Sequence, residues 1–140
     1  MPSGFALDPR IAADTLPIGD LALCSALLMN DARFPWLMLV PRRAKASEIT
    51  DLSEEDAATL TGEIRVATRV MLALAKPDKV NLGALGNVVP QLHVHVIARI
   101  RGDAAWPKPV WGAVPPRTYD QTTQRQLLGL LRQQLPMAPV

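Results

Sequence analysis

The segment Gln91-Leu92-His93-Val94-His95-Val96-Ile97 alternates polar and apolar residues, which is the pattern of a half-buried β-strand. Successive side chains of a strand point to opposite faces, so Gln91, His93 and His95 would share one face of the sheet. The chain has two histidines in total, and both lie in this segment. Imidazole can act as an acid, a base, a nucleophile or a metal ligand near neutral pH. The segment is therefore the first candidate for a functional site.

The elements around this strand differ in type along the chain. Residues 8–20 predict a short helical turn and an extended lead-in, and residues 21–30 and 36–40 predict a hairpin of two apolar strands. Ser53 is a candidate N-cap, and the apolar residues after it recur every three or four positions as far as Pro77, which predicts a long helix. The later segments predict two strands, a proline-interrupted loop with two tryptophans and a final helix, over residues 79–85, 88–100, 101–112 and 120–135. This order predicts an α+β domain with an antiparallel sheet.

Length and composition favour one globular domain over residues 1–140. The 140 residues are 49% hydrophobic, enough for a single core. The single cysteine, Cys24, excludes an internal disulfide and is expected to pack as a small apolar side chain. The N-terminus lacks the basic start and apolar run of a signal peptide, and no stretch approaches the roughly 20 apolar residues of a membrane helix. We therefore expect a cytoplasmic protein with no membrane partner.

The charge of the chain gives little reason to expect a nucleic-acid partner. The formal net charge is +2, too small to predict binding to a polyelectrolyte. Two basic clusters, residues 41–45 and 99–101, would either contact phosphate groups or form solvated turns.

Three kinds of site could use a histidine pair on one face of a strand. A metal site would need a third ligand, and the candidates Cys24 and Asp103 do not stand at a recognisable spacing. In a purely structural role, both imidazoles would only satisfy hydrogen bonds. In phosphoryl or nucleotidyl transfer, one histidine would be the nucleophile and the other would bind phosphate oxygens or assist the leaving group. The third kind is favoured, because Gln91 extends the polar face and glycines at 83 and 86 leave room for a ligand near the backbone.

The same segment resembles the signature of the histidine triad (HIT) superfamily, in which three histidines alternate with hydrophobic residues. Other resemblances occur in the family's order: Asn30 after the first long strand, residues 80–83 and 86–89 before the triad, and Trp106-Pro107 after it. The resemblance implies a HIT-like α+β fold with an antiparallel sheet of about five strands, a long central helix and a C-terminal helix. It also implies a homodimer.

By position, the resemblance implies a hydrolase or transferase that cleaves a phosphoanhydride or phosphoramidate bond at the α-phosphate of a purine nucleotide or dinucleoside polyphosphate. His93 would be the nucleophile and form a nucleotidyl-histidine intermediate, while His95 would hold phosphate oxygens and assist the leaving group. Asn81 and Asn87 would bond to ribose or phosphate, and Asn30 to the ribose. The implied partner is the nucleotide, with no cofactor required beyond a divalent cation accompanying it.

Gln91 departs from this pattern, because typical members of the superfamily have histidine there. Glutamine donates and accepts hydrogen bonds but does not titrate, so Gln91 could orient His93 or a phosphate without moving a proton. We count Gln91 among the catalytic candidates for this reason. The alternative function is a nucleotide-binding HIT module with impaired catalysis.

Overall fold

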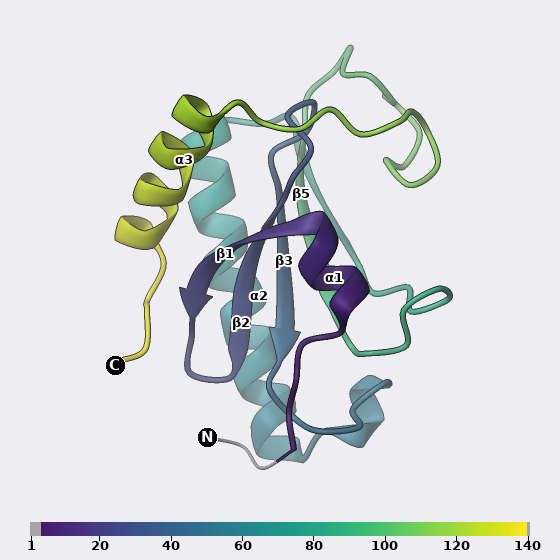
Figure 1. Cartoon of the computed structure of the whole chain (residues 1–140), viewed down its shortest axis with the longest axis vertical. Helices are drawn as coiled ribbons and strands as arrows, with labels where there is room; N and C mark the ends of the chain where they lie inside the picture. Colours follow the sequence, from purple (N-terminus) through teal and green to yellow (C-terminus); the bar gives the residue numbers. More distant parts are fainter. Residues whose placement is uncertain (1–3, 140) are drawn as a thin grey trace.

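The computed structural model describes residues 4–139, which form a five-stranded antiparallel sheet with helices on both faces (Figure 1). The strands are β1 (Thr15–Asp20), β2 (Cys24–Met29), β3 (Trp36–Pro41), β4 (Lys79–Gly83) and β5 (Val94–Arg99). Their order in the sheet is β1-β2-β3-β5-β4, and each neighbouring pair is antiparallel. The helices are α1 (Pro9–Asp14), α2 (Glu54–Ala75) and α3 (Gln121–Gln134), with a short 3-10 turn, η1 (Ile49–Asp51). The predicted fold class is confirmed.

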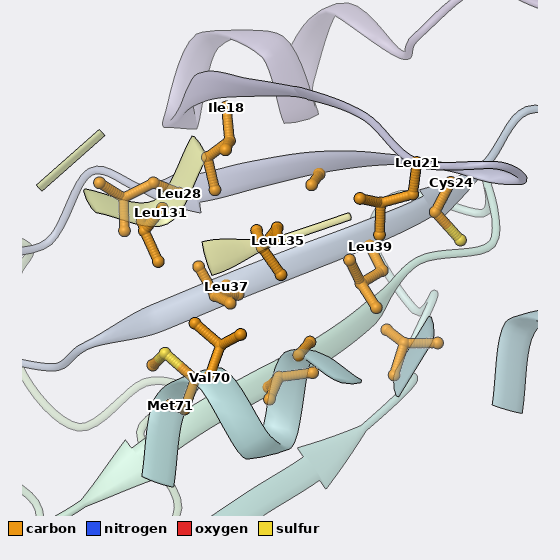
Figure 2. Close-up of a cluster of buried hydrophobic side chains, with 14 of the residues drawn as sticks. Ile18, Leu21, Cys24, Leu28, Leu37, Leu39, Val70, Met71, Leu131 and Leu135 are labelled. Carbon is orange, nitrogen blue, oxygen red and sulfur yellow. The ribbon is translucent and has the colours of Figure 1, made fainter. Parts of the chain in front are cut away.

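Helix α2 covers the face of the sheet that is turned away from the viewer in Figure 1. The helix begins after Ser53, whose Oγ accepts a hydrogen bond from the Asp56 N–H at 3.1 Å, as the N-cap pattern predicts. Its buried apolar residues meet α3 and the sheet in one large cluster (Figure 2). Members of this cluster include Leu28, Leu37, Leu39, Val70, Met71, Leu131 and Leu135. Burial of this cluster is the main stabilising contribution to the fold.

The opposite face of the sheet carries two smaller clusters. Ile11 of α1 packs with residues of β2 and β3, including Met38. Further along the sheet, Trp36 and Ile97 pack with residues of the loop that follows β5. In the register of β3 and β5, His95 lies opposite Met38, and Trp36 lies opposite Ile97. His95 therefore lies where the two clusters meet, between α1 and the loop.

Two predicted strands are shorter than the sequence indicated. The strand predicted over 79–85 ends at Gly83, and the strand predicted over 88–100 begins at Val94. The connection between them is irregular because Gly86 adopts a left-handed conformation with φ of 75° and Pro90 has no N–H to donate to a strand. The prediction that Gln91 lies in the histidine strand is therefore wrong.

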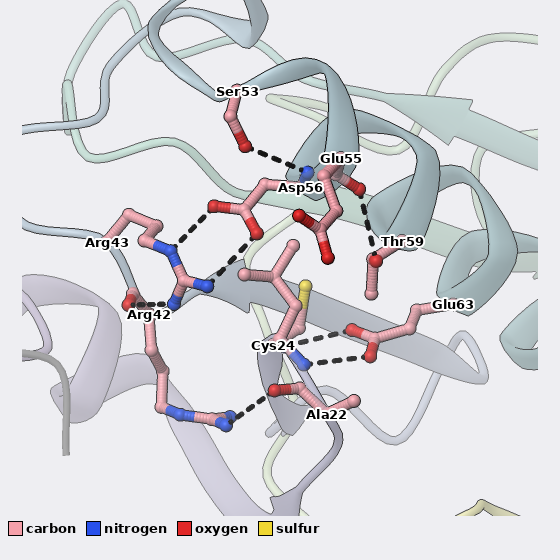
Figure 3. A network of polar contacts seen from close by, with 10 residues as sticks. Ala22, Cys24, Arg42, Arg43, Ser53, Glu55, Asp56, Thr59 and Glu63 are labelled. Carbon is pink, nitrogen blue, oxygen red and sulfur yellow. Dashed lines mark hydrogen bonds and ion pairs between the residues drawn. The ribbon is translucent and has the colours of Figure 1, made fainter.

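The basic cluster at residues 41–45 stabilises the fold (Figure 3). Arg43 donates through Nε and Nη2 to both carboxylate oxygens of Asp56, at 2.7 and 3.0 Å. Arg42 donates to the backbone carbonyls of Leu21 and Ala22. These two arginines join the end of β3 to the start of α2 and to the turn before β2. Among residues 4–139, no helix combines the length and the apolarity of a membrane-spanning segment.

Glu63 is a buried acid on the face of α2 that packs against the sheet, and it is 7% exposed. Its two carboxyl oxygens accept hydrogen bonds from the N–H groups of Leu23 and Cys24, both at 2.9 Å (Figure 3). Cys24 is fully buried, as predicted, and burial together with Glu63 raises the pKa of its thiol far above the usual range. The Glu63 carboxyl group therefore supplies acceptors for the two N–H groups at the start of β2.

Replacing Glu63 with alanine should lower the free energy of unfolding by about 3 kcal/mol, because two buried N–H groups would lose their acceptors. Urea denaturation measures the change. Arg65→Ala, at an exposed position of the same helix, should change it by less than about 0.5 kcal/mol. Equal losses in the two variants would contradict the role given to Glu63.

Candidate active site

His93 lies immediately before β5, and its ring has a defined orientation. Its Nδ1 is 2.6 Å from the backbone carbonyl oxygen of Gln91. A carbonyl oxygen can only accept, so Nδ1 carries the proton and Nε2 of the neutral ring keeps its lone pair. The residue is 8% exposed and borders a cavity. His93 therefore presents a nitrogen that can act as a nucleophile.

His95 is buried beside His93 and has the opposite arrangement of ring protons. The centroids of the two imidazoles are 5.0 Å apart. The indole Nε1 of Trp36 donates to Nδ1 of His95 at 2.9 Å, so the proton of the neutral ring is on Nε2. Burial lowers the pKa of His95 from 6.5 to about 4, and the neighbouring His93 lowers it as well. His95 is therefore a neutral hydrogen-bond donor near pH 7.

The side chain of Gln91 bonds to the N-terminal segment. Its Oε1 accepts a hydrogen bond from the Asp8 N–H, and its Nε2 donates to the Ala6 carbonyl oxygen, both at 2.8 Å. Asp8 in turn caps α1 and pairs with Arg10. Gln91 thus orients His93 through its backbone carbonyl, while its amide group anchors the segment that leads into α1.

Replacing Gln91 with alanine should raise the hydrogen-exchange rate of the Asp8 amide by about tenfold, because that amide loses its acceptor. Amide exchange followed by NMR or mass spectrometry measures the change. The control is Gln133→Ala, at an exposed position of α3, which should leave the exchange of this amide unaltered. The assignment fails if the Asp8 amide exchanges at the same rate in the Gln91 variant and the parent.

Two adjoining cavities lie beside the histidines. The histidine cavity has a volume of about 370 Å³ and walls that include Arg10, Asn87, His93 and His95. The tryptophan cavity has a volume of about 330 Å³ and walls that include Asn30, Trp36 and Val110. Asp14, Met29 and Trp111 border both. Each volume is typical of a small-molecule site, and the shared walls make the two cavities neighbouring parts of one candidate site.

The three predicted asparagines occupy different places. Asn30 borders the tryptophan cavity, where its Oδ1 accepts a hydrogen bond from the Tyr119 N–H at 3.0 Å. Asn87 borders the histidine cavity. Asn81 is a β4 residue whose Oδ1 accepts from Nη1 of Arg99 at 2.9 Å, and it borders neither cavity. The structure therefore brings two of the three to the candidate site.

Arg99 is a buried cation that holds the loop after β5. The residue is 1% exposed, and its Nε and Nη2 donate to both carboxylate oxygens of Asp103 at 2.8 and 2.9 Å. Its guanidinium also lies over the rings of Phe34 and Trp106, at 5.7 Å from each centroid. The second basic cluster is thus partly a structural ion pair, and it fixes the loop that carries Trp111.

Trp111 covers His95 from this loop. The centroids of their rings are 5.2 Å apart. A Cβ atom at residue 83 would lie 2.8 Å from Cη2 of Trp111, so the close approach of the indole requires glycine there. Trp111 packs against the cluster that contains Trp36 and Ile97, and it also lines both cavities. Trp106 instead packs on Arg99.

Trp36 and Asp14 border the site although no local sequence pattern predicts either of them there. The contact of Trp36 with His95 depends on the register of β3 against β5, which the sequence does not specify. Asp14 reaches the cavities because α1 folds onto the sheet face. The two candidates for a third metal ligand lie elsewhere: Cys24 is in the core beside Glu63, and Asp103 is paired with Arg99. Within residues 4–139, no three His, Cys, Asp or Glu side chains gather as a metal site.

Comparisons with known proteins agree with this fold. The HIT domain family matches residues 12–102. A histidine triad protein from Bradyrhizobium japonicum is 48% identical, with a TM-score of 0.92 over 94% of this chain and 98% of that one. A histidine triad protein from Sinorhizobium meliloti is 43% identical, with a TM-score of 0.93 over 96% of this chain and all of that one (100%). The fold is therefore the HIT fold, and the chain belongs to the HIT domain family.

A curated relative carries a more specific name. The chain is 38% identical over 74 residues to an AP-4-A phosphorylase from Mycobacterium tuberculosis. The matched stretch is 49% of this chain and 37% of that relative's length.

Proposed function

We propose that this protein is a nucleotide hydrolase or transferase that cleaves at the α-phosphate of a purine nucleotide or dinucleoside polyphosphate through His93. The observation that carries the proposal is that the two imidazoles are opposite tautomers. Nε2 of His93 keeps a lone pair, whereas Nε2 of His95 keeps a proton. A nucleophile and a hydrogen-bond donor 5.0 Å apart, measured between ring centroids, suit attack on a phosphate. Membership of the HIT family and the similarity to an AP-4-A phosphorylase support the nucleotide as substrate.

The proposed reaction has two steps. Nε2 of His93 attacks the α-phosphorus, a nitrogen–phosphorus bond forms, and the bond to the leaving group breaks with its electron pair. The imidazole of the nucleotidyl-histidine is then positively charged, and the hydrogen bond from its Nδ1–H to the Gln91 carbonyl stabilises that charge. In the second step water, or another acceptor, attacks the phosphorus and a new bond to phosphorus forms. The nitrogen–phosphorus bond breaks, its electron pair returns to Nε2, and the proton of the attacking group is released to solvent.

The two cavities offer places for the parts of such a substrate. We assign the nucleoside to the tryptophan cavity beside Asn30 and the phosphates to the histidine cavity beside Asn87. Nε1 of Trp111 is buried and has no hydrogen-bond partner among residues 4–139, and an acceptor atom of a bound ligand would satisfy it. No metal is required in this scheme beyond a divalent cation accompanying the phosphates. A cytoplasmic location stays a prediction from the sequence.

The test is a panel of diadenosine tetraphosphate, diadenosine triphosphate and adenosine phosphoramidate, with products separated by chromatography. Turnover of at least one compound with release of AMP, or of an AMP adduct with the acceptor, is the expected result. If every compound binds and none turns over, the protein is a nucleotide-binding module and the proposed activity is wrong.

We also propose that the protein forms a homodimer. Strand β4 is at the edge of the sheet, and the side chain of Leu82 on it is exposed. An open edge with an exposed apolar residue favours pairing with a second chain. Sedimentation velocity should give twice the mass of one chain, and Leu82→Lys should shift the mass toward one chain. A parent protein with the mass of one chain at micromolar concentration would contradict this proposal.

A further inference from the structure

Trp36 and His95 form a hydrogen bond in a buried part of the site. Trp36 is 6% exposed and His95 is 4% exposed, so water does not compete for this contact. The indole reaches His95 diagonally, because Trp36 lies opposite Ile97, two residues further along β5. An indole nitrogen donates and cannot accept, so Nδ1 of His95 must be the unprotonated nitrogen.

This contact opposes protonation of His95. An imidazolium carries a proton on both nitrogens, so a charged His95 would turn an N–H toward the N–H of Trp36 and lose the hydrogen bond. Two of the side chains beside the ring do not titrate: Trp111 packs on it, and Met38 lies opposite it in β3. His93, whose ring centroid is 5.0 Å away, does titrate. The titratable or charged groups that share its cavity are His93, and Arg10 and Asp14 of α1.

We propose that Trp36 is a positioning residue that locks His95 in the neutral Nε2–H form, and that the site therefore favours substrates whose leaving group departs as an anion. This inference rests on the proposed function. Burial and the neighbouring His93 also lower the pKa of His95, and both effects favour the neutral ring independently of Trp36. His95 then donates a hydrogen bond to a phosphate oxygen but does not give up its proton, since the product would be an imidazolate.

The lock distinguishes two classes of substrate. In a phosphoanhydride, the P–O bond breaks and the leaving phosphate keeps the electron pair as an anion, so no proton transfer is needed. In a phosphoramidate, the P–N bond breaks and the leaving amine needs a proton. Neither neutral His95 nor Gln91, which does not titrate, can supply that proton. We therefore assign phosphoanhydrides, including dinucleoside polyphosphates, as the preferred class.

NMR of the histidine rings tests the lock without reference to activity. Long-range ¹H–¹⁵N spectra of the parent protein from pH 5 to 8 should show one ring fixed as the Nε2–H tautomer, and a His93→Gln variant assigns the two rings. Trp36→Phe keeps an aromatic side chain and removes the donor, and it should raise the pKa of His95 by about one unit or more. The matched control is Trp106→Phe, which alters a tryptophan packed on Arg99 and should leave the pKa of His95 unchanged. An Nδ1–H tautomer in the parent would overturn the lock even if the variant failed to fold.

A competition between substrates tests the preferred class. The parent should cleave diadenosine tetraphosphate with a kcat/KM at least about 100-fold above that for adenosine phosphoramidate, and Trp36→Phe should narrow this ratio by about tenfold. Equal cleavage of both compounds by the parent would overturn the preference for anionic leaving groups while leaving the proposed function intact. No turnover of either compound or of diadenosine triphosphate would overturn both the preference and the proposed function, and the NMR result would still decide the lock.

Discussion

Replacing His93 with alanine is expected to lower kcat/KM for the best substrate by about 10,000-fold, because the variant has no nitrogen to attack the phosphorus. The backbone carbonyl of Gln91 and the Trp36–His95 hydrogen bond do not depend on the His93 side chain. The loss should therefore fall on the chemical step, and the affinity for adenosine should stay within about threefold of the parent value. Steady-state kinetics and calorimetric titration measure the two quantities.

Free imidazole provides the control for this variant. The shortened side chain leaves space beside the histidine cavity, so added imidazole should restore part of the turnover of His93→Ala and leave that of the parent unchanged. Turnover by His93→Ala equal to that of the parent would exclude His93 as the nucleophile.

Replacing Asp103 with alanine is expected to lower the free energy of unfolding by about 3 to 5 kcal/mol, the typical effect of removing one partner of a buried ion pair. The variant would leave Arg99 buried without its carboxylate, and the Ala105 N–H would lose its side-chain acceptor. The Trp106 N–H would keep only the weaker bond to the backbone carbonyl oxygen of residue 103. Urea denaturation measures the change. Asp78→Ala, at an exposed position where one hydrogen bond to the Arg101 N–H is lost, should cost less than about 1 kcal/mol.

The contribution of Asp103 to the free energy of unfolding should also depend on pH in a defined direction. The hydrogen bonds from Arg99 lower the pKa of Asp103 from 3.8 to about 2, although burial opposes this shift. A carboxyl group whose pKa is lowered by folding stabilises the native state fully above its unfolded pKa, and that contribution is lost as the pH falls toward 2. The difference in the free energy of unfolding between the parent and Asp103→Ala should be constant from pH 5 to 8 and should shrink below about pH 4. A loss no larger than that of Asp78→Ala at pH 7 would contradict the role of the pair.

Local signals in the sequence were sufficient for the helices and for the histidine pair. Ser53 and Asp120 are helix N-caps whose side chains accept from the third residue of their helices, as such residues do in many proteins. The alternation around His93 and His95 correctly predicted that their rings lie together, because a two-residue repeat places both on one face.

Contacts across the sheet and across long stretches of chain were not predictable. The side chain of Gln91 forms hydrogen bonds with Asp8 and Ala6, which lie 83 and 85 positions earlier in the sequence. The place of Gln91 before β5 depends on an irregular connection that the alternation pattern does not reveal. The contact of Trp36 with His95 depends on strand register, and the burial of Arg99 depends on the path of the loop after β5. These residues form polar contacts inside the fold, where residue type alone does not indicate the partner.

The most direct test of the central claim is to trap the nucleotidylated protein and locate the adduct. The protein would be mixed with diadenosine tetraphosphate or adenosine phosphoramidate, quenched within one turnover under alkaline denaturing conditions, digested, and mapped by mass spectrometry. We predict an AMP adduct on His93 in the parent and none in His93→Ala. An adduct on His95 or on any other residue, or turnover without any adduct in quenches taken across the first turnover, would contradict the assignment of His93 as the nucleophile.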